Sequence, residues 1–90
     1  MDYQSFTQSL LQDEVPVPVS AYLQSLWYDA KGNWQRAHEI VQDIDDPKAA
    51  LIHAYLHRKE GDTFNADYWY RRANAMRPDV SLEREWDDLV

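Results

Sequence analysis

The sequence predicts an all-α protein: two stacked antiparallel helical hairpins with one flanking helix at each end. Only two glycines and four prolines occur in 90 residues, which is too few for the turns of an all-β fold. Apolar residues recur at the three- and four-residue spacing of amphipathic helices. The pattern around Gly32 also returns 29 residues later around Gly61. The chain is the length of one domain.

The first helix is expected within residues 1–14, where Tyr3, Phe6 and Leu10 are spaced as one helical stripe. A helix this short needs a docking partner to be stable. Residues 15–19 read "VPVPV", and we expect a stiff connector because each proline fixes its own φ and lacks an N–H.

The first hairpin is predicted over residues 20–46. Ser20 is suited to cap its first helix, and Gly32 is suited to end that helix in the left-handed conformation. Asn33 is a good N-cap for the second helix. Residues 45–46 are two aspartates, either of which can cap the helix that follows.

The second hairpin, over residues 47–78, repeats these signals. Pro47 suits the first turn of a helix, Gly61 ends that helix, and Asp62 caps the next one. We expect this last helix to run to Met76, just before a proline.

An acidic helix capped by Ser81 is predicted within residues 79–90. It follows a mildly basic segment, residues 53–77, so the tail either folds back over that segment or is a solvated end; we favour the solvated end. The terminal helices are expected to cover opposite ends of the two-hairpin array, because helical arrays need capping at both ends.

The repeat resembles the tetratricopeptide class of helical repeats over residues 19–78. Its period of 29 residues is shorter than the ~34 of that class, and the expected Leu-Gly pair is replaced. Residues 52–73, "IHAYLHRKEGDTFNADYWYRRA", also resemble a small uncharacterised bacterial family without an established activity. The residues that carry the tetratricopeptide resemblance are Tyr28, Gly32, Asn33, Trp34 and Ala37, then Ala54, Gly61, Asp62, Ala66, Tyr70, Ala73 and Pro78.

A metal site is one hypothesis for the stretch "HAYLHRKEGD". His53 and His57 are four residues apart on one helix face, with Glu60 one turn further, and paired histidines at this spacing can bind Zn²⁺. His38 could approach from the first hairpin, but no HExxH motif exists and no third ligand is fixed. The favoured interpretation is histidines that pack or form hydrogen bonds, with no cofactor. The 29-residue offset aligns His53 and His57 with residues that are not usual metal ligands, Gln24 and Tyr28.

Binding of a partner or an anion is a second hypothesis, for His57, Arg58, Tyr68 and Arg72. Aromatic and guanidinium groups together can stack bases or bind carboxylates and phosphates. The alternative is a surface of ordinary salt bridges. Nucleic-acid binding through Arg58, Arg71 and Arg72 ranks last, because the net charge of −7 opposes it.

No catalytic residues are predicted, since no nucleophile motif or phosphate-binding loop occurs. The leading expectation is a noncatalytic module that binds a protein or peptide, or a second copy of itself, in the groove of the stacked hairpins. The chain has no cysteine, no apolar run near the ~20 residues of a membrane span, and no signal-peptide pattern. We therefore expect a cytoplasmic location.

Overall fold

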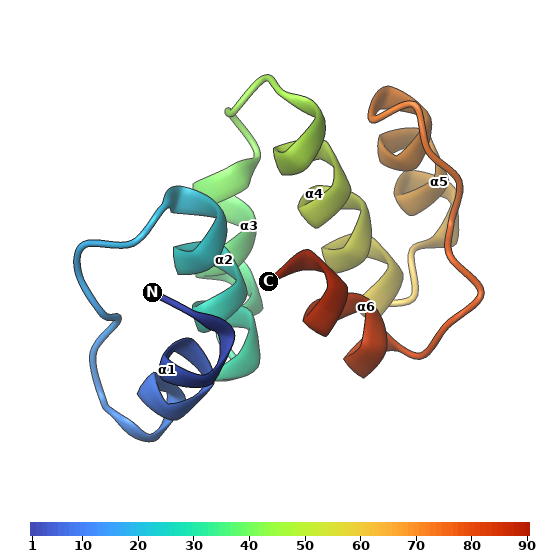
Figure 1. Ribbon diagram of the computed structural model, residues 1–90. Helices are drawn as coiled ribbons and strands as arrows, with labels where there is room; N and C mark the ends of the chain where they lie inside the picture. Colours follow the sequence, from blue (N-terminus) through green and yellow to red (C-terminus); the bar gives the residue numbers. More distant parts are fainter.

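The computed structural model describes residues 1–90 and contains six α-helices and one short 3₁₀ helix, so the all-α class is confirmed (Figure 1). Helix α2 packs on α3 and α4 packs on α5, which is consistent with two hairpins, and α4 also contacts α2, α3 and α6. None of the helices has both the length and the apolar character to cross a bilayer. The elements are α1 Tyr3–Gln8, η1 Ser9–Leu11, α2 Ala21–Ala30, α3 Trp34–Val41, α4 Pro47–Lys59, α5 Thr63–Arg72 and α6 Leu82–Leu89.

The two glycine turns have the same geometry, as the repeat predicts. Gly32 has φ +86° and Gly61 has φ +87°. At each turn the N–H of the glycine and that of the next residue donate back into the preceding helix, which is the Schellman ending. Asn33 and Asp62 follow these glycines and cap the next helix through their side chains. Local sequence therefore sets both hairpin turns.

Small residues form the contact between the helices of each hairpin. Ser25 and Ala37 are fully buried in the first hairpin, where Ser25 Oγ donates to the Ala37 carbonyl at 2.8 Å. Ala54 and Ala66 are fully buried at the matching positions of the second. Small side chains let the helix axes approach closely, and large neighbours fill the remaining core.

Helix α5 ends at Arg72, so the prediction that it runs to Met76 is wrong. Asn74 adopts φ +57°, and the N–H of Ala75 donates to the Tyr70 carbonyl at 2.8 Å. This is the Schellman ending again, with asparagine in place of glycine, since asparagine tolerates the left-handed conformation. The expected N-terminal helix is also shorter than 14 residues, because α1 passes into η1 after Gln8.

The two terminal helices meet each other, which corrects the prediction that they cover opposite ends of the array. Phe6 of α1 stacks on Trp86 of α6 with ring centroids 6.0 Å apart. Trp86 Nε1 donates to the Leu26 carbonyl of α2 at 3.0 Å. The Tyr3 hydroxyl also donates to Asp87 Oδ1 at 2.7 Å. The core is thereby closed on one side of the hairpins, beside α2 and α4 (Figure 1).

The acidic tail folds back, so the favoured interpretation of a solvated end is wrong. Glu85 is 5% exposed, and its carboxylate accepts from Arg58 Nη1 at 2.7 Å and from the Tyr70 hydroxyl at 2.5 Å. A buried carboxylate needs such partners to remain charged. The other acidic residues of α6 are exposed, so the fold-back rests on one carboxylate and the apolar residues beside it. Helix α6 covers the α2 and α4 surface.

Candidate metal centre

The chain has three histidines, and all three lie together between α3 and α4. His38 projects from α3, whereas His53 and His57 project from α4. The ring centroid of His38 is 4.6 Å from that of His53 and 5.3 Å from that of His57. One ring nitrogen from each histidine lies within 4.8 Å of the other two. The first hairpin thus supplies the third candidate ligand, which the sequence alone does not fix.

Two tryptophans enclose the histidines. Trp34 stacks on His38 with ring centroids 4.9 Å apart, and its Nε1 donates to the Leu56 carbonyl at 2.7 Å. Trp69 of α5 stacks on His53 at 4.0 Å. These contacts hold two of the three imidazoles between aromatic surfaces contributed by both hairpins.

Burial keeps the central histidine neutral. His53 is 5% exposed, and this burial, together with the neighbouring His38 and His57, lowers its pKa to about 4. Burial also lowers the pKa of His38, with the nearby His57 as the next cause. The only hydrogen bond formed by a histidine side chain is that of His57. The imidazoles of His38 and His53 therefore have lone pairs that no protein group uses.

Glu60 lies beside His57 at a distance that suits orientation of the ring. Glu60 Oε1 is 2.7 Å from His57 Nδ1. A carboxylate on Nδ1 fixes the tautomer and leaves Nε2 as the nitrogen open to a metal. Asp62 is also near, and a nitrogen of His57 and one oxygen from each acid lie within 4.8 Å of one another. However, Asp62 already accepts from the N–H and the side-chain amide of Asn65.

Arg58 and Arg72 do not form one anion site. Arg58 is held by Glu85 and also donates to the Val80 carbonyl, on the side of α4 that faces α6. Arg72 lies on α5, with its guanidinium 5.4 Å from the Trp69 ring centroid and 3.2 Å from the Tyr68 hydroxyl. His57 faces α3 and the other histidines. His57, Arg58, and the pair Tyr68 and Arg72 therefore lie at three separate places in the structure, so the four residues of the second hypothesis do not form one site.

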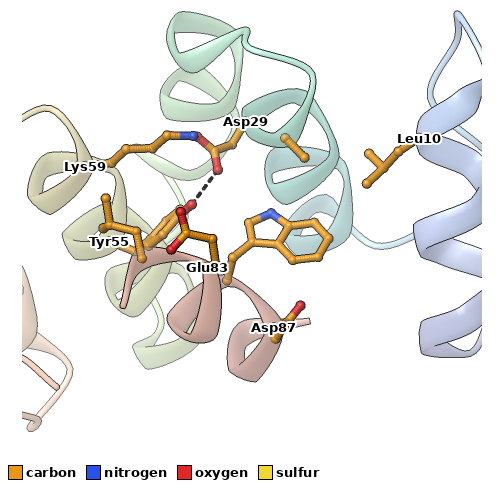
Figure 2. A pocket seen from close by; sticks show the side chains of 9 residues that line it. Leu10, Asp29, Tyr55, Lys59, Glu83 and Asp87 are labelled. Carbon is orange, nitrogen blue, oxygen red and sulfur yellow. Dashed lines mark hydrogen bonds and ion pairs between the residues drawn. The ribbon is translucent and has the colours of Figure 1, made fainter. Parts of the chain in front are cut away.

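A cavity of about 270 Å³ on the α6 side was missed by sequence reasoning. Its deepest polar group is Asp29, whose side chain is 1% exposed and lies between Lys59 Nζ at 2.9 Å and the Tyr55 hydroxyl at 2.7 Å (Figure 2). Glu83 and Asp87 lie at the same cavity. Because Lys59 and Tyr55 both donate to Asp29, this network holds α2 to α4 and leaves no buried polar atom without a partner. No sequence motif indicates this network, because Asp29 is far in sequence from Tyr55 and Lys59.

No family model, no curated protein and no solved structure matches the chain. The chain is a compact all-helical domain.

Proposed function

We propose that the protein binds one divalent transition-metal ion of the zinc class through His38, His53 and His57. The observation that carries this proposal is the convergence of every histidine in the chain, from two hairpins, to within 4.8 Å of one another at their ring nitrogens. Three imidazoles suit zinc, copper or nickel and do not suit magnesium or calcium, which prefer oxygen ligands.

The chemistry of the ligands supports the proposal. Metals bind the neutral imidazole, and the lowered pKa of His53 keeps that form dominant at neutral pH. His53 forms no hydrogen bond within the protein, so its imidazole is free to coordinate a metal ion.

The spacing fits after a small closure. Zn–N bonds of about 2.05 Å at tetrahedral angles separate the ligating nitrogens by about 3.4 Å, so nitrogens that lie within 4.8 Å of one another have to approach by at most about 1.4 Å. His38 and His57 are only partly buried, and rotation of their side chains can supply this movement. Three protein ligands leave a fourth position for solvent, and Glu60 acts as the outer carboxylate on His57.

A calorimetric zinc titration of the metal-free protein tests this proposal. We expect one ion per chain, and loss of binding in His53→Ala and in His38→Ala variants whose circular dichroism remains helical. Glu60→Gln should weaken binding about 10–100-fold. Glu39→Gln is the matched control, because this exposed carboxylate lies next to His38 in sequence and should not change the affinity. Absence of binding, or binding that survives His53→Ala, contradicts the proposal.

The metal would link the two hairpins, since one ligand comes from α3 and two come from α4. We also propose that the hairpins are tetratricopeptide-like units with a 29-residue period. The equal φ angles of Gly32 and Gly61 and the equivalent caps at Asn33 and Asp62 support this proposal.

Protein interaction is the second candidate function. Helix α6 lies over α2 and α4, so this surface of the stacked hairpins is covered by the chain itself. The observation that still favours an interaction is the uncovered outer side of α5, where Phe64 is 82% exposed.

A further inference from the structure

The outer side of α5 is an aromatic and basic surface, made by Phe64, Tyr68, Arg71 and Arg72. Tyr68 lies four residues after Phe64, and Arg71 and Arg72 lie three and four residues after Tyr68, so the four share one helix face. Phe64 is 82% exposed and Tyr68 is 40% exposed. Helix α4 is the only helix with which α5 makes extensive contact, and α5 stands at the edge of the molecule (Figure 1). We call these four residues the α5 surface.

The basic end of the α5 surface is poorly neutralised within the chain. Arg71 is exposed and forms no ion pair, because Asp67, four residues before it, pairs with Arg77 at 3.3 Å. Arg72 has only Asp45, at 3.8 Å, and the side chain of Asp45 is 96% exposed. An ion pair this exposed contributes little. Two guanidinium groups are thus available in a protein of net charge −7.

The opposite end of the same helix is acidic. Glu60 and Asp62 precede the first turn of α5. From the start of α5 to its end the order is therefore acidic, aromatic, basic. Arg71 lies five residues, about 7.5 Å, along the helix from the midpoint between Phe64 and Tyr68, and the two acids lie in the turn that precedes the helix. This order is complementary to itself when the helix direction is reversed.

We propose that the α5 surface is the interface of a two-fold symmetric homodimer in which two α5 helices pack antiparallel. Phe64 of each copy then lies against Tyr68 of the other. The arginines of each copy lie over the acidic start of the other α5, as a two-fold axis requires of a self-complementary surface. This arrangement removes the exposed Phe64 from water and gives Arg71 a carboxylate.

The interface is small, and this sets its strength. One face of a ten-residue helix buries less than the ~800 Å² per partner of a standard interface. The dimer is therefore weak and depends on protein concentration, and the charge pairs at its edges make it sensitive to salt. None of the four residues of the α5 surface is a proposed metal ligand, and Glu60, at the acidic end, is the one residue that both proposals use.

Sedimentation equilibrium in the presence of a chelator tests the proposal, since the chelator excludes metal-bridged association. Over about 10 μM to 1 mM protein at low salt we expect a monomer–dimer equilibrium. Phe64→Asp should weaken it at least about tenfold, as loss of a central aromatic contact does. Arg71→Glu should weaken it as well, and raising the salt concentration should weaken the unmodified protein.

Leu11→Asp is the matched control, because Leu11 is 89% exposed and lies in η1 at the other end of the chain. It should leave the association constant unchanged. A monomer at every concentration overturns the proposal and assigns the α5 surface to a partner of different sequence. A dimer that survives Phe64→Asp, or that Leu11→Asp disrupts equally, also overturns it.

Discussion

Phe6 and Trp86, from opposite ends of the chain, stack with ring centroids 6.0 Å apart and close the core. Trp86 adds a hydrogen bond from its indole N–H to the Leu26 carbonyl. Both terminal helices are short, and each depends on this contact because a helix of eight residues or fewer is unstable alone.

Trp86→Ala should therefore destabilise the whole domain. Removing a buried tryptophan costs about 3–5 kcal/mol, a large fraction of the stability of a small domain. Urea unfolding followed by circular dichroism measures the loss. Tyr3→Phe is the control: it removes the exposed hydroxyl bond to Asp87 and keeps the ring, so it should change the unfolding free energy by less than about 0.5 kcal/mol. Equal effects of the two variants would contradict this role of Trp86.

Glu85→Ala should destabilise the protein far more than Glu83→Ala, although both residues are acids in the first turn of α6. Glu85 is buried against Arg58 and Tyr70, and its removal leaves the Arg58 guanidinium without its partner, at about 3 kcal/mol. Glu83 is exposed, and its loss should cost about 0.5 kcal/mol or less. Denaturant unfolding measures the free energy of unfolding of both variants. Similar losses would show that the docking of the C-terminal helix does not depend on Glu85.

Tyr55 and Tyr70 should make the folded protein sensitive to alkali. Burial raises the pKa of both hydroxyls, with their hydrogen bonds to Asp29 and Glu85 as the next causes. Above pH about 10 the unfolded chain loses these two protons while the folded protein keeps them. The free energy of unfolding is therefore unaffected below about pH 10 and falls as pH rises, by roughly 1.4 kcal/mol per pH unit for each tyrosine.

Unfolding by denaturant between about pH 9 and 11 measures this slope. Tyr55→Phe and Tyr70→Phe should each reduce it by about one proton, whatever they do to the stability at neutral pH. An unchanged slope in both variants would rule out the linkage.

The left-handed positions that end three helices give a further test. Gly32→Ala and Gly61→Ala should each lower the unfolding free energy by about 1–2 kcal/mol, because an L-residue is strained there. The cost is conformational, since no atom lies within 4 Å of a Cβ placed at either glycine. Asn74→Gly should instead raise stability by a few tenths of a kcal/mol. A destabilising Asn74→Gly would contradict the assignment of this turn.

Sequence reasoning predicted features that depend on neighbouring residues. Ser20, Asn33, Asp62 and Ser81 cap helices as expected, and of the two candidate aspartates Asp46 caps α4. These predictions succeed because a cap or a glycine turn is a local hydrogen-bonding problem that four or five residues solve.

The arrangement of the termini could not be predicted in the same way. The periodicity of residues 82–89 identifies an amphipathic helix, but it does not say which surface that helix covers. The docking of α6 depends on Glu85 reaching Arg58 and on Trp86 reaching Leu26, contacts between residues far apart in sequence. The end of α5 is hard to predict for a different reason: asparagine, here Asn74, is a weaker signal for a left-handed residue than glycine.

The candidate metal site was half visible in the sequence. His53 and His57 share a helix face, which their spacing predicts. The sequence does not fix His38 as the third ligand, because only the packing of α3 on α4 brings it to the other two histidines. The repeat predicts that consecutive hairpins stack. All three histidines lie on the two helices α3 and α4, and this was the signal in the sequence that His38 could join the other two.

X-ray absorption at the zinc edge, on protein loaded with one equivalent of zinc, tests the central claim most directly. The proposal predicts three imidazole ligands at about 2.0 Å and one light-atom ligand, and the loss of this imidazole signature in His38→Ala, which should no longer bind zinc. Zinc bound by fewer than three imidazoles, or a spectrum that His38→Ala leaves unchanged, would contradict convergence of the two hairpins on one metal ion.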